Sequence, residues 1–333
     1  MQYQFDFRPY RRRFKPPIIT SHGTWDIREG VILRLVDQLG NIGFGEIAPI
    51  AWFGSESIEQ ALEFCHQLST KINHKDEIFK IPNDLPATQF GFESAWKNVT
   101  EKCSLHKAND SSSSHSFTYS GLLGVGETAL QQSKHLWEQG YRTFKWKIGV
   151  HPIGSELNIF KQLTQILPSR AKIRLDANGG LNYDDANLWM WTCDNLAANS
   201  ENSPEIEFIE QPLPKESFSQ MLELSFCYGT KIALDESVAN LEQLKYCYEE
   251  GWREIFVIKP GIAGSPTRLR QFCQEHKLDV VFSSVFETSV GRKAALQLAS
   301  EIYNSSQSQR AVGFGVKHCF SDDEEQNWLN NLW

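Results

Sequence analysis

Residues 144–148 have the sequence Phe-Lys-Trp-Lys-Ile, in which apolar and charged residues alternate. Successive side chains of a strand point to opposite faces, so Lys145 and Lys147 share one face and the apolar residues share the other. Such a strand is most often a surface strand with its charged face in water. The segments that follow in the chain favour a different arrangement.

Each of the next three predicted strands ends in a carboxylate, namely Asp176, Glu210 and Asp235. A single acid in this position usually caps the following helix or faces the positive end of its dipole. Here three acids follow in succession, and Lys259 ends the strand after them. Barrel active sites are built at the C-terminal ends of parallel strands. The pattern therefore favours inward-facing lysines beside a set of acids.

Three carboxylates on neighbouring strands would repel one another unless a cation neutralised them. Mg²⁺ prefers oxygen ligands and usually keeps positions open for water and substrate. Zinc is disfavoured because neither His nor Cys lies at a strand end in this region. We therefore predict that Asp176, Glu210 and Asp235 hold a metal ion.

The lysines lie on both sides of these three strands, Lys145 and Lys147 on one side and Lys259 on the other. A lysine can act as a base when a nearby cation lowers its pKa. A substrate held on the metal would have an ammonium group on each side. This arrangement suits removal of a proton next to a carboxylate, since positive charge stabilises the enediolate as it develops.

Beyond residue 116, short apolar segments alternate with helical patterns. Eight segments have strand character: 117–122, 141–148, 172–176, 207–210, 231–235, 254–259, 279–284 and 311–315. This alternation predicts parallel βα units, and eight strands close a barrel. An open doubly wound sheet is the alternative, but no Gly-x-Gly-x-x-Gly follows a strand to bind a nucleotide.

The first hundred residues differ from the rest. Residues 30–36 form a predicted strand, residues 41–45 form a turn into another, and a helix begins after Ser57, with Gln60 completing a capping box. Strands followed by helices suggest an α+β domain. A polar serine tract at residues 109–116 is typical of a connection, so we place the domain boundary there.

Composition excludes several classes of protein. The 333 residues include 33 Lys and Arg and 41 Asp and Glu, and the net charge is −8. Because no dense basic run exists beyond residues 11–13, a nucleic-acid partner is not expected. No window is apolar enough to span a membrane, and the start lacks a signal-peptide core. Free thiols in a reducing compartment, and hence a cytoplasmic protein, are expected from seven scattered cysteines: 65, 103, 193, 227, 247, 273 and 319.

The chain resembles the enolase superfamily, and within it the muconate-lactonising subgroup. The resemblance is carried by Lys-Trp-Lys at 145–147, Asp-Ala-Asn at 176–178, Glu-Gln-Pro at 210–212, Asp-Glu-Ser at 235–237 and Lys-Pro at 259–260. Residues 45–56 (GEIAPIAWFGSE) and 283–291 (SSVFETSVG) are similar to the o-succinylbenzoate synthase family of that subgroup.

The resemblance implies a modified (β/α)7β TIM-type barrel over residues 113–316. It also implies an α+β capping domain over residues 1–112 and a C-terminal tail, 317–333, that returns to the cap. The expected oligomeric state is left open between monomer and homo-oligomer.

The activity implied is that of a carbon–oxygen hydro-lyase. It would catalyse the syn dehydration of 2-succinyl-6-hydroxy-2,4-cyclohexadiene-1-carboxylate to 2-succinylbenzoate, on the route to menaquinone or phylloquinone. By this resemblance Lys147 removes the proton and Lys259 stabilises the anion from the opposite face. The expected cofactor is Mg²⁺, with Mn²⁺ as a substitute, and the expected partner is a small-molecule substrate.

Two inward positions have alternative roles. Lys145 either lowers the pKa of Lys147, or contacts the substrate carboxylate, or forms a structural ion pair. Arg174 has the inward parity of Asp176 and either meets the succinyl carboxylate or pairs with a neighbouring acid.

Further candidate substrate-binding residues lie in predicted loops. Trp52 and Phe53 either close over the substrate ring or pack between the domains. Ser283 and Ser284 are candidates for binding a substrate carboxylate, and Glu287 is a candidate support for the metal ligands or a lysine.

Two other functions compete with this prediction. An N-succinylamino acid racemase or dipeptide epimerase would use Lys147 and Lys259 as bases on opposite faces of one carbon. The apolar loop at 51–54, and the lack of an obvious acid on the last strand for a peptide amine, disfavour the epimerase. A non-catalytic binding protein is less expected, because every ionisable position is retained.

Overall fold

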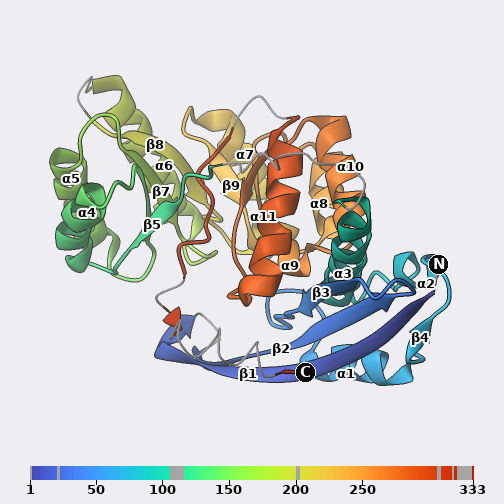
Figure 1. Cartoon of the computed structure of the whole chain (residues 1–333). Coiled ribbons are helices and arrows are strands. Elements are labelled where there is room, and N and C mark those ends of the chain that lie inside the picture. Colours follow the sequence, from blue (N-terminus) through green and yellow to red (C-terminus); the bar gives the residue numbers. More distant parts are fainter. Residues whose placement is uncertain are drawn as a thin grey trace.

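A computed structural model describes residues 2–20, 23–105, 116–199, 203–305, 309–316, 319–320 and 332–333. All but the last residue of the serine tract at 109–116, and most of the tail at 317–333, lie outside these ranges. Figure 1 shows an N-terminal sheet with its helices and, above it, a larger α/β region.

The N-terminal region combines an antiparallel sheet with helices. Its strands lie in the order β3-β2-β1-β4, and their bounds are β1 (Tyr3–Thr20), β2 (Gly23–Asp37), β3 (Ile42–Ile47) and β4 (Lys71–Ile72). The helices are α1 (Ile58–Gln67), α2 (Asp76–Phe79) and α3 (Pro86–Leu105). The predicted capping box at the start of α1 is confirmed, since Ser57 and Gln60 each bond the other's backbone N–H.

The strand β3 lies very close to α3 because two glycines face the helix. A Cβ at Gly45 would lie 2.0 Å from the carbonyl oxygen of Gly91, and one at Gly43 would lie 2.2 Å from that of Ala95. Only glycine allows two backbones to approach so closely. This packing fixes β3, whose penultimate residue, Glu46, reaches the α/β region.

The α/β region contains seven parallel strands in the order β11-β10-β9-β8-β7-β6-β5. Their bounds are β5 (Ser120–Leu123), β6 (Thr143–Lys147), β7 (Lys172–Asp176), β8 (Glu205–Glu210), β9 (Ile232–Leu234), β10 (Ile255–Ile258) and β11 (Asp279–Phe282). Each overlaps one of the first seven predicted strand segments. The sheet curls so that its two edge strands approach each other.

The predicted eighth strand, residues 311–315, joins these two edges as a pair of isolated bridges and not as a regular strand. Val312 pairs with Tyr119 beside β5, and Gly313 pairs with Ser283 at the end of β11. The N–H of Val312 donates to Thr118 at 2.8 Å, and that of Gly313 donates to Phe282 at 2.7 Å. The (β/α)7β barrel is thus confirmed, with its last position held by short pairing on both sides.

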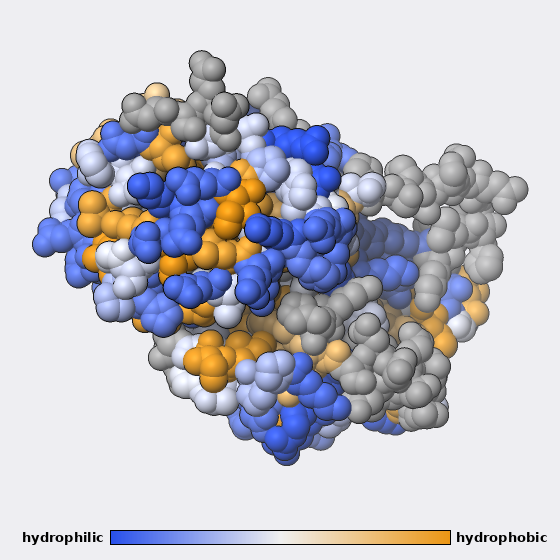
Figure 2. All heavy atoms as spheres, turned by 90° about the vertical axis from the view of Figure 1, so that its left-hand side faces the viewer, coloured by the Kyte–Doolittle hydropathy of each residue, from blue (hydrophilic) through white to orange (hydrophobic). Residues whose placement is uncertain are grey.

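Helices follow the strands and cover the outside of the barrel (Figure 1). Their bounds are α4 (Thr128–Glu138), α5 (Ile153–Ile166), α6 (Tyr183–Asn199), α7 (Phe218–Cys227), α8 (Leu241–Glu249), α9 (Pro260–Ala263), α10 (Pro266–His276) and α11 (Ser289–Tyr303). The outer face over α4 and α5, turned toward the viewer in Figure 2, mixes hydrophilic and hydrophobic residues. No helix among the described residues is long and apolar enough to cross a lipid bilayer.

The barrel strands have an outer and an inner apolar side. Trp146 of β6 packs outward against Trp189 of α6, with ring centroids 6.2 Å apart. Because side chains alternate along a strand, Lys145 and Lys147 then face into the barrel. A smaller core fills the interior and consists of Phe208, Ala233, Ile255, Val257 and Val281.

The N-terminal region is attached to the barrel by Glu46. Its carboxylate accepts hydrogen bonds from the N–H of Thr288 at 2.9 Å, the N–H of Gly291 at 2.8 Å and the hydroxyl of Tyr10 at 2.5 Å. The first turn of a helix has N–H groups without partners inside the helix. A carboxylate from the cap sheet therefore satisfies the start of α11, where the helix dipole also favours negative charge.

Arg28 of β2 makes a second attachment. Its guanidinium is almost fully buried and donates to the carbonyl oxygens of Val285 at 2.9 Å and Pro49 at 2.8 Å. It also donates to the carbonyl oxygen of Ala48. Arg28 thus ties the loop at 283–288, between β11 and α11, to the segment that follows β3.

The described parts of the tail contact β1 and β2. The ring of Phe320 stacks on Phe14 at 4.8 Å, and the ring of Trp333 lies 4.5 Å from the guanidinium of Arg8 and 4.1 Å from that of Arg34. These contacts agree with a tail that returns to the cap. The limits of the three regions stay a prediction.

Glu287 is buried inside the 283–288 loop. Its carboxylate accepts hydrogen bonds from the Ser284 hydroxyl at 3.0 Å and from the Val285 N–H at 2.7 Å. Burial raises the pKa of Glu287 to about 7, although hydrogen bonds from its own loop act in the opposite direction. These contacts lie within the loop, and not with the predicted metal ligands or a lysine.

The raised pKa of Glu287 predicts a pH-dependent stability. The folded chain keeps this proton up to about pH 7, whereas the unfolded chain releases it near pH 4.5. The stabilisation is therefore complete below pH 4.5 and is lost as the pH rises through 7. Relative to Glu287→Gln, we expect the wild-type free energy of unfolding to fall by up to about 3 kcal/mol over this interval. Urea unfolding of both proteins across this pH range measures it, and parallel profiles would contradict it.

Candidate active site

A cavity of about 350 Å³ lies at the C-terminal ends of the barrel strands, beneath the cap. It brings together the predicted catalytic, metal-binding and substrate-binding residues: Trp52, Phe53, Lys145, Lys147, Arg174, Asp176, Glu210, Asp235, Lys259, Ser283 and Ser284. A larger cavity of about 540 Å³ lies near the N-terminal ends of β6 and β7 and contains none of them. The chemistry of the residues, and not cavity size, identifies the candidate site.

The register of the strands places the acids side by side. Lys147 pairs with Asp176 across β6 and β7, and Asp176 pairs with Glu210 across β7 and β8. Lys145 donates to Asp176 and Glu210, with both nitrogen–oxygen distances 2.8 Å. On the far side of the acids, Lys259 forms an ion pair with Asp235.

The acids repel one another strongly. Burial raises the pKa of Glu210, and the neighbouring charge of Asp176 raises it further. Burial also raises the pKa of Asp235 and of Glu236. Burial alone would lower the pKa of Lys145, but Asp176 and Glu210 outweigh it and hold that pKa above its ordinary value.

The donor set fits a hard divalent cation. Among the described residues no three Asp, Glu, His or Cys side chains converge tightly enough to form a metal site as they stand. The ammonium groups of Lys145 and Lys259 lie against the carboxylates instead. The Oε2 atom of Glu236 is also buried with no hydrogen-bond partner among the described residues. Carboxylates with raised pKa values and an unpaired buried oxygen together suit Mg²⁺.

The two lysines of β6 differ in their contacts. Lys145 is held by two carboxylates. Lys147 lines the same cavity, and no hydrogen bond or ion pair joins its amine to another described residue. Lys147 is therefore the uncommitted amine of the pair.

Arg174 pairs with a neighbouring acid, which was one of its two predicted roles. Its Nε donates to Glu207 at 2.7 Å, and its Nη1 donates to the carbonyl oxygen of Ala311 at 2.8 Å. Its Nη2 is buried and has no hydrogen-bond partner among the described residues. One donor of this arginine is thus left for another group.

The two aromatic residues of the cap loop have different surroundings. Phe53 is buried, and its ring centroid lies 4.1 Å from the Nζ of Lys259, a cation–π contact. Trp52 is 41% exposed and packs edge-on against Trp25 and Phe53 at the cavity wall.

The two serines at the end of β11 also differ. The Ser284 hydroxyl donates to Glu287 at 3.0 Å and accepts from the Phe286 N–H at 2.9 Å, so it is engaged within its own loop. Ser283 lines the cavity and pairs with Gly313 of the closing segment.

Sequence reasoning missed two residues that organise the acids. Gln211 accepts hydrogen bonds from the N–H of Asp235 at 3.0 Å and so fixes the end of β9. Asn178 donates to Glu236 at 3.2 Å. These residues adjoin the predicted acids in the motifs, but nothing in a strand pattern shows which partner across the barrel they meet.

Comparisons with known proteins identify the family of this chain. A family model described as enolase C-terminal domain-like matches residues 128–327, and one described as the MenC N-terminal domain matches residues 6–99. The o-succinylbenzoate synthase of Thermosynechococcus vestitus is 36% identical over 317 residues, which is 94% of this chain and 92% of that protein. The o-succinylbenzoate synthase of Haemophilus influenzae is 26% identical over 283 residues, covering 82% of this chain and 79% of that protein.

A solved structure of o-succinylbenzoate synthase from Thermosynechococcus elongatus BP-1, complexed with Mg in the active site, aligns with a TM-score of 0.86 and 34% identity. The alignment covers 98% of this chain and 99% of that chain. The L-Ala-D/L-Glu epimerase of Bacillus subtilis shares the fold at 19% identity, with a TM-score of 0.75, and covers 96% of this chain and 91% of that chain. This chain therefore belongs to the enolase superfamily and, within it, to the o-succinylbenzoate synthase family.

Proposed function

We propose that this chain is an o-succinylbenzoate synthase that dehydrates 2-succinyl-6-hydroxy-2,4-cyclohexadiene-1-carboxylate to 2-succinylbenzoate. Family membership supports the reaction. The observation that carries it is the uncommitted amine of Lys147, which shares one cavity with Lys259 and three carboxylates. The product would pass to menaquinone or phylloquinone synthesis.

The topology supports opposite positions for the two lysines. Lys147 ends β6, and Lys259 follows β10. Three strands separate β6 from β10 in the sheet order, and the closing segment makes the eighth position of the ring. Two positions four apart in a ring of eight face each other, so the two amines approach a bound substrate from opposite faces.

Lys147 is proposed to accept the proton from the carbon next to the ring carboxylate. The electrons of that C–H bond form a ring double bond, and the C–O bond on the same face breaks. The proton on Lys147 can then pass to the departing hydroxide, which leaves as water. The product is aromatic, so the elimination is strongly downhill.

Lys259 is proposed to hold its ammonium against the opposite face of the ring, where it stabilises the delocalised negative charge. Phe53 packs on this ammonium, and Asp235 bonds to it. Lys145 is proposed to keep the acids neutralised beside Lys147, since it bonds to two of them.

Asp176, Glu210 and Asp235 are proposed to hold Mg²⁺, with Mn²⁺ able to replace it. The metal, when bound, supplies positive charge that stabilises the enediolate form of the substrate carboxylate. The solved Thermosynechococcus structure with Mg in its active site supports this choice.

Substrate recognition is proposed to involve Arg174 for the succinyl carboxylate, Trp52 and Phe53 for the apolar ring, and Ser283 and Ser284 for a carboxylate. Ser283 is better placed than Ser284, whose hydroxyl is already engaged. Six cysteines are free thiols, namely Cys65, Cys193, Cys227, Cys247, Cys273 and Cys319. They support a reducing compartment, here proposed to be the cytoplasm.

Racemisation of N-succinylamino acids is the second candidate activity. Two lysines on opposite faces of one cavity are also what that reaction requires. The cavity walls include Ile18, Ile19, Trp25 and Trp52, which suit a hydrocarbon ring. This lining favours the dehydration.

Replacement of the proposed base tests the assignment. We expect Lys147→Ala to lower kcat for dehydration roughly 10³-fold, because no other described amine in the cavity is uncommitted. The measurement is the ultraviolet loss of the cyclohexadiene carboxylate with Mg²⁺ present. Lys161→Ala, an exposed lysine of α5, should keep the wild-type rate. Wild-type racemisation of N-succinylamino acids without dehydration would favour the second candidate instead.

Removal of the metal tests the proposed ligands. EDTA should abolish dehydration, and added Mg²⁺ or Mn²⁺ should restore it. Isothermal titration should detect Mg²⁺ binding to the wild type and much weaker binding to Glu210→Gln, because the variant lacks one carboxylate charge. A full rate in chelator, or unchanged Mg²⁺ affinity in Glu210→Gln, would contradict the metal assignment.

A further inference from the structure

The strand β8 contains a bulge that turns an acid into the barrel. Opposite β7, Ile206 pairs with Ile173, but Phe208 and not Glu207 pairs with Arg174. Glu207 is therefore an extra residue on β8. A bulge of this kind redirects a side chain, and it leaves Glu207 buried next to the inward-facing Phe208.

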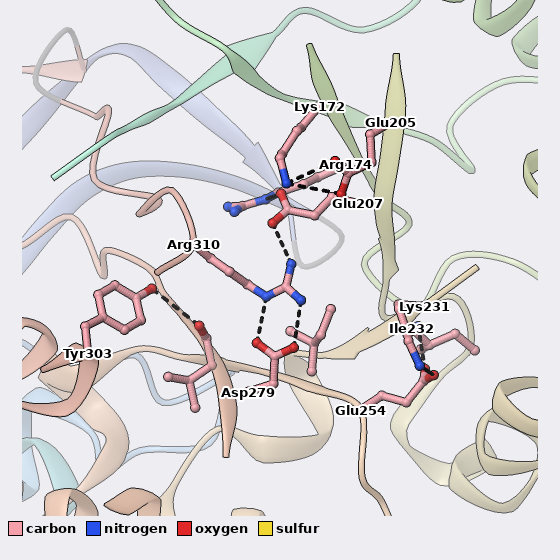
Figure 3. Close-up of polar contacts among 12 residues, drawn as sticks. Lys172, Arg174, Glu205, Glu207, Lys231, Ile232, Glu254, Asp279, Tyr303 and Arg310 are labelled. Atoms are coloured by element: carbon pink, nitrogen blue, oxygen red, sulfur yellow. Dashed lines mark hydrogen bonds and ion pairs between the residues drawn. The ribbon is translucent and has the colours of Figure 1, made fainter. Parts of the chain in front are cut away.

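Glu207 is the centre of a chain of buried ion pairs (Figure 3). One carboxylate oxygen binds the Nε of Arg174 at 2.7 Å, and the other binds the Nη1 of Arg310 at 2.6 Å. The Nε and Nη2 atoms of Arg310 also donate hydrogen bonds to the two carboxylate oxygens of Asp279, each 2.7 Å long. Exposure falls along the chain, from 35% for the Asp279 side chain to 2% for Arg174.

The residues of this ion-pair network stay charged although they are buried. Burial alone would raise the pKa of Glu207, but Arg174 and Arg310 lower it below its ordinary value. Two arginines and two acids alternate in this network of ion pairs, so the network as a whole carries no net charge. Breaking such a buried network leaves a charge without its partner.

Arg174, the most buried residue of the ion-pair network, reaches the active-site cavity. Arg174 lines that cavity. Its guanidinium is planar, so fixing Nε on Glu207 and Nη1 on Ala311 also fixes the direction of Nη2. In Figure 3 the terminal nitrogens of Arg174 point away from Glu207. Nη2 is the atom without a described partner, and a buried donor left unpaired is costly.

We propose that Glu207 and Arg310 are positioning residues that aim the Nη2 of Arg174 at the substrate carboxylate farthest from the ring. This proposal rests on the proposed function, because it requires a substrate with a second carboxylate. The bulge in β8 places Glu207 inside the barrel, and Arg310 fixes its carboxylate through an ion pair. Glu207 in turn fixes the orientation of Arg174, whose Nη2 faces the cavity. A ligand without the second carboxylate gains nothing from this arrangement.

Binding of two ligands by the full chain with Mg²⁺ separates this role from a structural one. The first ligand is 2-succinylbenzoate, and the second is 2-propanoylbenzoate, which lacks the terminal carboxylate. Isothermal titration gives both Kd values for the wild type and for Glu207→Gln. We expect the variant to bind 2-succinylbenzoate about tenfold more weakly and 2-propanoylbenzoate equally well. Equal weakening of both ligands, or of neither, would overturn the proposal.

A matched control lies two residues away on the same strand. Glu205 forms an exposed ion pair with Lys172 and does not contact Arg174 (Figure 3). Glu205→Gln should leave both affinities unchanged. If Glu207→Gln does not fold, Asp279→Asn decides the question, because it frees Arg310 at the exposed end of the chain. It should weaken only 2-succinylbenzoate, by about threefold, and an equal effect on both ligands would refute the positioning role.

Two further measurements separate failure of this proposal from failure of the proposed function. A wild type that does not dehydrate the cyclohexadiene carboxylate would refute the function itself. A wild type that does so, with Glu207→Gln treating both ligands alike, would refute only the positioning role. In the Arg174→Met background, Glu207→Gln should cause no further loss of 2-succinylbenzoate affinity, since Glu207 acts through Arg174.

Discussion

Compensation of negative charge at the C-terminal ends of the barrel strands is the constraint on which the rest of the structure depends. Asp176, Glu210 and Asp235 are each less than 10% exposed, and Glu236 lies beside them. Such a cluster is stable only with positive charge inside it. Two lysines meet that need from opposite sides. In the proposed mechanism the same positive charge stabilises a developing enediolate, so what stabilises the folded site also prepares it for that reaction.

The cap covers one side of this site. Residues of β1, β2 and the loop after β3 form the upper walls of the cavity. Their position depends on Glu46, which binds the first turn of α11, and on Arg28, which binds the 283–288 loop. Burial of the acids and lysines under the cap strengthens the electrostatic contacts between them. The cap sheet therefore acts on the chemistry through packing, although the proposed metal ligands and lysines all come from the barrel.

The buried charges below the cavity are held by a network of ion pairs between Arg174, Glu207, Arg310 and Asp279. The closing segment pairs with the two edge strands through two isolated bridges. Arg174 donates a hydrogen bond to Ala311 of this segment, and Arg310 immediately precedes it and binds Glu207. A buried ion pair contributes little net stability compared with apolar packing. It does fix orientation, since a forked guanidinium bonds its acceptors in one plane. This network is therefore better suited to setting the direction of Arg174 than to stabilising the barrel.

The sequence by itself determined the barrel, the inward face of Lys145 and Lys147, and the gathering of the acids at one rim. These follow from local rules, because side chains alternate along a strand and parallel strands end at the same edge. Only the tertiary structure decided which lysine is bound and which is uncommitted, that Phe53 packs on Lys259, and that Glu287 serves its own loop. It alone also revealed the bulge at Glu207, because a shift in register depends on the neighbouring strand. Such contacts join residues far apart in the chain, and no periodic pattern in one segment encodes its partner in another.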